Sequence, residues 1–325
     1  MSRYIGCVGN YNDAKCVLFG SPFDGTSSFR PGSRFAPEAI RRESWGLETY
    51  SPYQNKDVAI AKVYDSGDLE LPFGNAEAAL DMVKKTAAKI LSDGKTPVML
   101  GGEHLMTLGL FRAVYEKYND VCVIHFDAHT DLRDEYLGEK LSHATVVRRV
   151  YEIIYSPCHS ELQAKNPDPS LALRVTKEGA PSVTEECAFR VTEECAFRVT
   201  RDDKRVWQFG IRSGEKCEFE FAEKHGHITK FTTDGIDTAV ASLKGRPVFV
   251  TVDLDVLDPS VFPGTGTPEP GGVQYMDLQN ALIQLGQLNV VGFDIVELAP
   301  DYDRSGISTA AACKILREML IAFAL

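Results

Sequence analysis

The chain has 325 residues, of which 44% are apolar and 25% charged, and its formal net charge is -11. These proportions are ordinary for a globular protein, and the negative charge argues against nucleic acid as a partner, because phosphate binding needs Lys and Arg. No apolar stretch is long enough for a membrane span or a signal peptide. The eight Cys are scattered without a CxxC pair, which predicts reduced thiols and a cytoplasmic protein.

Short apolar runs alternate with helical patterns along most of the chain. In the first half, strands are predicted at 16–20, 96–102 and 121–127, and helices at 36–47, 75–94 and 105–118. Asn75 is the expected N-cap of the second helix, and Gly94 marks its end. In the second half, strands are predicted at 206–211, 246–255 and 289–297, followed by a last helix at 309–324. This alternation predicts an α/β fold with a mainly parallel central sheet.

The segment 153–203 interrupts this pattern with a tandem repeat of eight residues, whose copies start at 174, 182, 190 and 198. The period matches no common solenoid, and four such copies are too short for a stable array. We therefore predict a single catalytic domain over 1–325 with a surface insertion at about 153–203. A lid or a subunit-contact hairpin is the alternative interpretation of the insertion.

Carboxylate and imidazole side chains follow three of the predicted strands. These are His104 after VMLGGE, then Asp127, His129 and Asp131 in HFDAHTDLRD, and Asp253 and Asp255 in TVDLDVLD. Ligands bind at the carboxyl ends of strands in such sheets, so the six side chains are expected to converge there.

Clustered buried carboxylates are costly unless a metal ion compensates their charge. A mixed imidazole and carboxylate set suits Mn, Fe, Co, Ni or Zn, and the absence of Cys argues against a structural zinc site. Six ligands are too many for one catalytic metal with an open position, but they are enough for two metals that share a bridging carboxylate.

The motifs GGEH, HFDAHTDLRD and TVDLDVLDPS, in this order, closely resemble the three signatures of the ureohydrolase family, which comprises arginase, agmatinase and their relatives. The resemblance implies a three-layer α/β/α sandwich and two Mn²⁺ ions that together hydrolyse a guanidino group to urea. It assigns one ion to His104, Asp127, Asp131 and Asp253, and the other to Asp127, His129, Asp253 and Asp255. Asp127 and Asp253 would bridge the two ions.

The same resemblance points to three further site residues. His143 matches the family's proton-shuttling His, since imidazole titrates in the range that protonation of a leaving amine needs. Glu297 matches the carboxylate that holds the guanidinium, which a carboxylate can bind in a bidentate fork. Thr267, on a Gly/Pro loop, is a weaker candidate for substrate contact.

Other charged residues near the signatures are expected to play supporting roles. His125, Glu103 and Asp294 are predicted to belong to the core or to support the ligands. His225 and His227 are predicted to be exposed loop residues.

The loop LRDEYLGEKLSH after the second signature lacks the Asn and the Gly-rich ending of the arginase loop, which binds its substrate's carboxylate and amine with neutral residues such as Asn and Ser. The N-terminal FRPGSRFAPEAIRR also resembles agmatinase, so a small cationic guanidino substrate is predicted, with agmatine converted to putrescine and urea. Arginase and guanidinobutyrase activities stay open, because Arg133 offers a cation for a carboxylate tail. A deacetylase-like amide hydrolase and a non-catalytic metal-containing interaction protein are the alternatives of other classes. The family further implies a homo-oligomer, a trimer or a hexamer.

Overall fold

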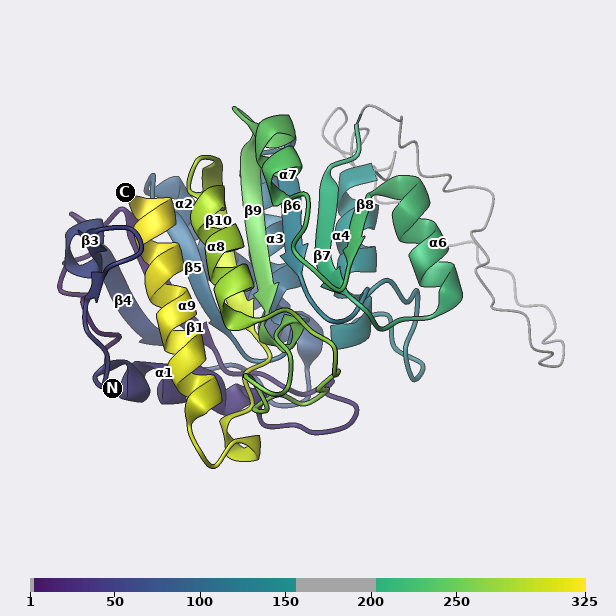
Figure 1. The fold of residues 1–325 in the computed structure, drawn as a ribbon, viewed down its shortest axis with the longest axis horizontal. Coiled ribbons are helices and arrows are strands. Elements are labelled where there is room, and N and C mark those ends of the chain that lie inside the picture. Colours follow the sequence, from purple (N-terminus) through teal and green to yellow (C-terminus); the bar gives the residue numbers. More distant parts are fainter. Residues whose placement is uncertain (1–2, 156–202) are drawn as a thin grey trace, which may run out of the picture.

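The computed structural model describes residues 3–155 and 203–325, and its centre is an eight-stranded sheet (Figure 1). The strands lie in the order β4-β1-β5-β10-β9-β6-β7-β8, and every pair of neighbours is parallel. Their bounds are β1 Cys16–Ser21, β4 Val63–Asp68, β5 Thr96–Gly101, β6 Cys122–Phe126, β7 Val206–Ile211, β8 His227–Lys230, β9 Pro247–Asp253 and β10 Asn289–Val296. The short strands β2 Tyr50–Ser51 and β3 Lys56–Asp57 form a separate antiparallel pair.

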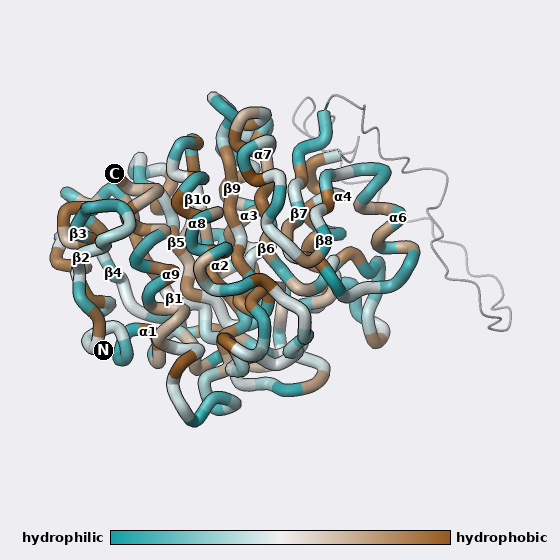
Figure 2. Tube along the Cα trace, viewed as in Figure 1, coloured by the Kyte–Doolittle hydropathy of each residue, from teal (hydrophilic) through white to brown (hydrophobic). Residues whose placement is uncertain are grey.

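Helices cover both faces of the sheet and make three layers, as Figure 1 shows. One hydrophobic core lies under α1 Ala36–Ser44, α7 Ile236–Leu243, α8 Tyr275–Leu285 and α9 Ile307–Ala324. The other lies under α2 Ala76–Ser92, α3 Met106–Lys117, α4 Val146–Tyr155 and α6 Lys216–His225. The apolar residues follow the strands at the centre (Figure 2), as expected for a sheet that is buried on both faces. The predicted α/β/α sandwich is therefore confirmed.

Local signals in the sequence located the helix ends well. The Asn75 side chain accepts a hydrogen bond of 3.0 Å from the Ala78 backbone N–H and so caps α2. The helix ends at Ser92, and Gly94 follows with a left-handed φ of 73°.

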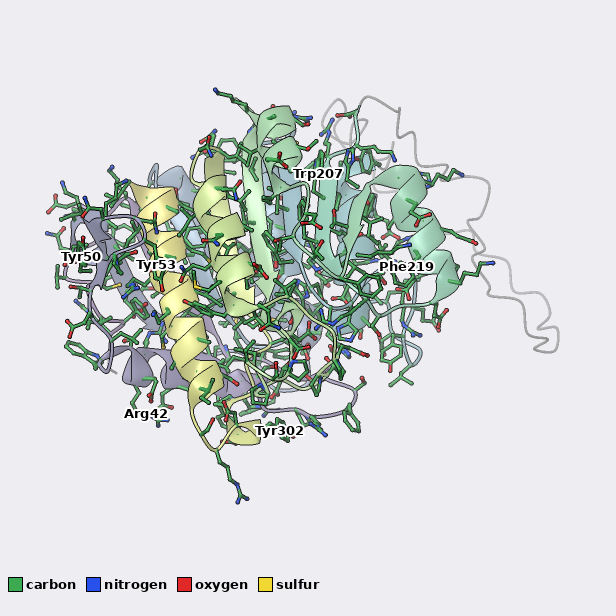
Figure 3. The ribbon with its side chains drawn as sticks, in the orientation of Figure 1. Arg42, Tyr50, Tyr53, Trp207, Phe219 and Tyr302 are labelled. Atoms are coloured by element: carbon green, nitrogen blue, oxygen red, sulfur yellow. The ribbon has the colours of Figure 1, made fainter. Side chains whose placement is uncertain are left out.

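The sequence did not predict the two strands at the edges of the sheet. β4 and β8 are partly exposed and have no continuous apolar run, which is the signal that identified the central strands. The prediction that His225 and His227 are exposed loop residues was therefore wrong. His225 is the last residue of α6. His227 is the first residue of β8, and its ring stacks on that of Trp207 with centroids 3.7 Å apart; Figure 3 labels Trp207.

Helix α4 continues to Tyr155, so residues 153–155 of the predicted insertion are helical. Residues 156–202 of the insertion, with most of its repeats, lie outside the described residues. Cys7, Cys16, Cys122 and Cys313 are buried thiols. In the described part of the chain, no helix has the length and apolarity needed to cross a bilayer.

Candidate metal centre and active site

The site lies at the carboxyl ends of β5, β6 and β9, which are all located at the same edge of the parallel sheet. The turn after β5 passes close to another segment, because the Gly102 N–H donates to the Ser21 carbonyl and the Glu103 N–H to the Phe23 carbonyl. A Cβ on Gly102 would lie 1.9 Å from the Phe23 carbonyl oxygen, so only glycine fits there. This close approach fixes where His104, two residues further on, enters the site.

Three carboxylates surround one ring nitrogen of His104. Its Nδ1 lies 3.1 Å from Asp127 Oδ2, 3.1 Å from Asp131 Oδ2 and 3.2 Å from Asp253 Oδ2. These residues come from three different strand ends, and all of them are buried. The first predicted ligand group is therefore brought together as the sequence suggested.

The second group forms around His129, whose Nδ1 lies 3.0 Å from Asp255 Oδ2 and 3.4 Å from Asp127 Oδ1. Backbone amides hold these carboxylates in place. The Asp253 side chain accepts the Asp255 N–H at 2.9 Å and caps a short 3-10 turn, Leu254–Val256. Asp255 Oδ1 accepts the Ala128 N–H at 3.1 Å, and Asp127 Oδ1 accepts the His129 N–H at 2.5 Å. Asp127 is shared by both groups.

The donor set fits divalent cations. A ring nitrogen carries at most one hydrogen, so His104 Nδ1 cannot satisfy three carboxylates, and none of its contacts is a well-directed hydrogen bond. Donor atoms that bind one ion at right angles with bonds of about 2.1 Å lie about 3 Å apart, which is the spacing seen here. The donors are thus arranged around a common point, as the ligands of an ion are.

The electrostatics of the cluster also favour a cation. Burial and the neighbouring carboxylates raise the pKa of Asp131 to about 7 and hold the pKa of Asp253 well above its usual value. Burial alone would lower the pKa of His104 and His129, but the surrounding carboxylates outweigh it and raise both. The cluster therefore retains protons near neutral pH, and a divalent ion would take their place.

His143 opens a short turn, His143–Thr145, whose N-cap is Ser142. Its Nδ1 lies 2.9 Å from the Thr26 carbonyl oxygen, and its backbone N–H donates to Thr26 Oγ1 at 3.1 Å. A carbonyl can only accept, so Nδ1 carries the hydrogen, and Nε2, which lies 3.3 Å from Ser28 Oγ, is the atom open to proton exchange. Burial first, and then the positive charges of His129 and His104, lower the pKa of His143.

Glu297 follows β10, and its Oε1 accepts the backbone N–H of His104 at 2.7 Å. Its backbone has a left-handed φ of 65°, which costs a non-glycine residue about 1–2 kcal/mol. Burial, followed by repulsion from Glu103, raises the pKa of Glu297 well above its usual value. A cation bound beside this carboxylate would relieve that repulsion.

Glu103 supports the loop that holds His143, and the sequence did not reveal this link through Thr26 between the two residues. Its carboxylate accepts the Thr26 N–H at 2.9 Å, the Thr26 hydroxyl at 2.7 Å and the Ser27 hydroxyl at 3.2 Å. His104 has a similar support, because its Nε2 lies 3.1 Å from Thr251 Oγ1, which donates to Asp294 at 2.7 Å. The predicted supporting roles of Glu103 and Asp294 agree with these contacts.

Thr267 and Arg133, at the edge of the site, each interact with a carboxylate of the protein. Thr267 donates to Asp255 Oδ2 at 3.2 Å, so it orients a predicted ligand. Arg133 pairs with Glu215 at 2.8 Å, and its guanidinium lies 4.9 Å from the centroid of the Tyr136 ring. The charge of Arg133 is thus already matched by a carboxylate.

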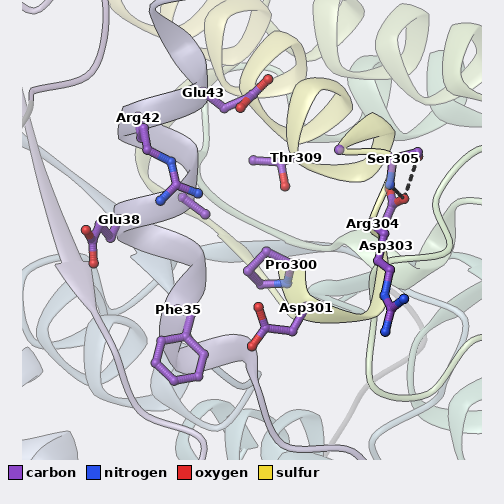
Figure 4. Close-up of a pocket in the computed structure, with 12 residues that line it drawn as sticks. Phe35, Glu38, Arg42, Glu43, Pro300, Asp301, Asp303, Arg304, Ser305 and Thr309 are labelled. Atoms are coloured by element: carbon purple, nitrogen blue, oxygen red, sulfur yellow. Dashed lines mark hydrogen bonds between the residues drawn. The ribbon is translucent and has the colours of Figure 1, made fainter.

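A separate hollow lies between α1 and the start of α9 (Figure 4). Figure 4 labels most of the residues that line it: Phe35, Glu38, Arg42, Glu43, Pro300, Asp301, Asp303, Arg304, Ser305 and Thr309. Asp303 there accepts hydrogen bonds from the Ser305 and Ser308 backbone N–H groups at 2.9 and 2.7 Å, so it satisfies one N–H in the first turn of α9. None of the predicted site residues lines this hollow.

Comparison with known proteins identifies the family of this chain. The model of the arginase family matches residues 14–322. The agmatinase of Bacillus subtilis (strain 168) is 40% identical over 98% of this chain and 96% of its own length. The proclavaminate amidinohydrolase of Streptomyces clavuligerus is 30% identical over 95% of this chain and 88% of its own length. The crystal structure of a putative agmatinase from Clostridium difficile superposes with a TM-score of 0.81 at 44% identity, covering 97% of this chain and 99% of that one.

A three-layer fold with a buried His/Asp metal-binding cluster at the strand ends defines this protein as a ureohydrolase, a hydrolase that acts on linear amidines. The chain belongs to the arginase family, and within it the chain is agmatinase-like.

Proposed function

We propose that this protein hydrolyses agmatine to putrescine and urea with two Mn²⁺ ions. The proposal depends above all on the convergence of six donor residues beside a buried carboxylate and an imidazole. One ion would be held by His104, Asp127, Asp131 and Asp253, and the other by Asp127, His129, Asp253 and Asp255. Bound divalent ions lower the pKa of water and so supply hydroxide at neutral pH.

The residues of the chain itself would handle the guanidinium and the proton. Glu297 is anchored on one oxygen by the His104 N–H, and its carboxylate would bind the guanidinium by charge-assisted hydrogen bonds. His143 would deliver a proton to the leaving amine through Nε2, because Nδ1 is engaged by the Thr26 carbonyl. Thr267 would keep Asp255 oriented at the edge of the site.

Two observations support a cationic substrate tail over an acidic one. Arg133 was the cation that could have received a tail carboxylate, and it is paired with Glu215 and stacked on Tyr136. The agmatinase of Bacillus subtilis, which is named for this activity, is 40% identical over 98% of this chain. A substrate with a carboxylate tail would then leave that group without a partner, which costs several kcal/mol and can reach about 10⁴-fold in discrimination.

The test is urea release from the Mn²⁺-loaded protein with agmatine, arginine and guanidinobutyrate. Agmatine should have by far the highest kcat/KM. A preference for arginine or guanidinobutyrate would overturn the choice of substrate and leave the metal chemistry standing. Binding of two ions without urea release from any of the three would instead favour the non-catalytic alternative.

We also propose that the protein is a homo-oligomer, as the family resemblance implies. Analytical ultracentrifugation of the purified protein tests this directly, and a mass equal to one chain would contradict it.

A further inference from the structure

A fully buried imidazole, His125, lies next to the predicted metal centre, one residue before the end of β6. It lies two residues before Asp127, so both side chains point to the same face of the strand. Its Nε2 is 2.8 Å from Asp127 Oδ2, and its Nδ1 is 3.1 Å from the Nε2 of Gln208 on the neighbouring strand β7. Gln208 is itself buried and also lies 3.0 Å from the Thr130 carbonyl oxygen.

This arrangement determines which nitrogen of His125 carries the hydrogen. The Thr130 carbonyl can only accept, so the atom of Gln208 that faces it must be the NH₂ group. The second hydrogen of that group then points to His125 Nδ1, which must accept it. The hydrogen of the neutral imidazole is therefore on Nε2, and it is donated to Asp127 Oδ2.

We propose that His125, held by Gln208, is a positioning residue for the shared carboxylate Asp127. The hydrogen bond from His125 fixes Oδ2, while the His129 N–H at 2.5 Å fixes Oδ1. The carboxylate is thus clamped from both ends and directs one oxygen to His104 and the other to His129. Partners that orient a metal ligand typically change metal affinity 10- to 100-fold when they are removed.

This inference rests on the proposed metal centre, in which Asp127 bridges the two ions. The alternative is that His125 is itself a metal ligand. Its ring lies close enough to the ligand atoms of His104, Asp127 and Asp131 for that role. In the hydrogen-bonded arrangement, Nε2 donates to the carboxylate and Nδ1 accepts from Gln208, so neither nitrogen has a lone pair left for a metal ion. The two roles predict different numbers of bound ions.

The experiment compares Mn²⁺ binding to the full-length chain and its variants, by chelator competition for affinity and elemental analysis for stoichiometry. His125→Phe removes the donor and keeps a planar ring, and it should weaken binding 10- to 100-fold while two ions still bind at saturation. His125→Gln places an amide donor near the original Nε2 and should recover most of the affinity. A general packing defect would not be rescued in this way.

His227→Phe is the matched control, because His227 lies on the edge strand β8 and stacks on Trp207. This variant should bind Mn²⁺ as the wild type does. If His125→Phe does not fold, the Gln208→Leu variant tests the proposal in its place. It should weaken binding several-fold, and an unchanged affinity would overturn the proposal.

The proposal would also be overturned if His125→Phe bound Mn²⁺ with the affinity of the wild type. If that variant bound only one Mn²⁺ ion at saturation, His125 would be a metal ligand instead. Fewer than two ions in the wild type would contradict the proposed metal centre itself, so the two failures can be told apart.

Discussion

Replacing Glu297 with Gln should stabilise the metal-free protein while it weakens catalysis. Glu297 is buried beside Glu103, and burial and that repulsion raise its pKa well above the usual value. Gln preserves an oxygen that can accept the His104 N–H, which Glu297 accepts at 2.7 Å. The substitution therefore removes the unfavourable charge and keeps the hydrogen bond.

The size and the sign of the effect follow from linkage. A carboxyl whose folded pKa is raised contributes its full stability below the unfolded value of about 4.3, and that stability is lost as the pH rises toward the folded pKa. Each pH unit in this window costs the wild type about 1.4 kcal/mol, whereas Gln stays neutral. For a chain of 325 residues, the entropy of unfolding is about 0.7 kcal/mol per degree, so the melting temperatures should diverge by about 2 °C per pH unit.

Thermal melts of EDTA-treated protein between pH 4 and pH 9 provide the measurement, with Glu38→Gln on the exposed side of α1 as the matched control. The two Glu297 proteins should melt together near pH 4 and separate as the pH rises, while the control follows the wild type throughout. A Glu297→Gln protein that melts at or below the wild type at every pH would refute the reasoning.

The same variant should lose activity when loaded with Mn²⁺. A charge-assisted hydrogen bond contributes about 1.5–3 kcal/mol and a neutral one about 0.5–1.5 kcal/mol, so kcat/KM for agmatine should fall roughly fivefold to tenfold for each hydrogen bond that loses its charge. Gain of stability with loss of function is the expected trade-off at an active site. Unchanged kcat/KM would remove Glu297 from substrate binding.

Three further outcomes are expected. His143→Ala should retain both metal ions by elemental analysis and lose about 10²- to 10⁴-fold in kcat, the usual range for a general acid; full activity would exclude His143 from proton transfer. Because the pKa of Asp131 in the metal-free site is about 7 and that of Asp253 is also raised, protons compete with Mn²⁺ at lower pH. Chelator competition should therefore show affinity at pH 6 about tenfold or more weaker than at pH 8, and equal affinities would contradict this account. Deleting two of the eight-residue repeat units within 174–203 should leave soluble expression, melting temperature and Mn²⁺ binding intact, and an insoluble product would show that the segment belongs to the core.

The central strands and the donor residues could be predicted from the sequence because their signals are local. β6 and β9 are mostly apolar, and each leads into ligand-type side chains spaced two apart, which are Asp127, His129 and Asp131 after β6 and Asp253 and Asp255 at the end of β9. A parallel sheet brings such strand ends to one edge, so Asp127 and Asp253 were expected to meet although they are far apart in the chain. The helix cap at Asn75 was equally local.

The supporting contacts could not be predicted, because each joins residues that are distant in sequence. Thr26 contacts His143 across 117 positions, and the His104 N–H reaches Glu297 across 193. No sequence signal near Thr26 indicates that it faces an imidazole. The Gln208 amide likewise reaches its hydrogen-bond partner on β6 only because β7 pairs with β6 in the folded sheet. Such partners are fixed by the folded sheet and not by a motif.

Two of the residues that the site depends on are held in a backbone conformation that their side chains disfavour. Asp131 and Glu297 have φ values of 52° and 65°, in the left-handed region where glycine is the usual residue. Glycine in either position would relax the backbone but remove a carboxylate from the cluster. The surrounding hydrogen bonds, such as that from the His104 N–H to Glu297, hold the chain in this geometry. Backbone strain and carboxylate repulsion thus coincide at the strand ends, and binding of cations there would relieve the electrostatic part.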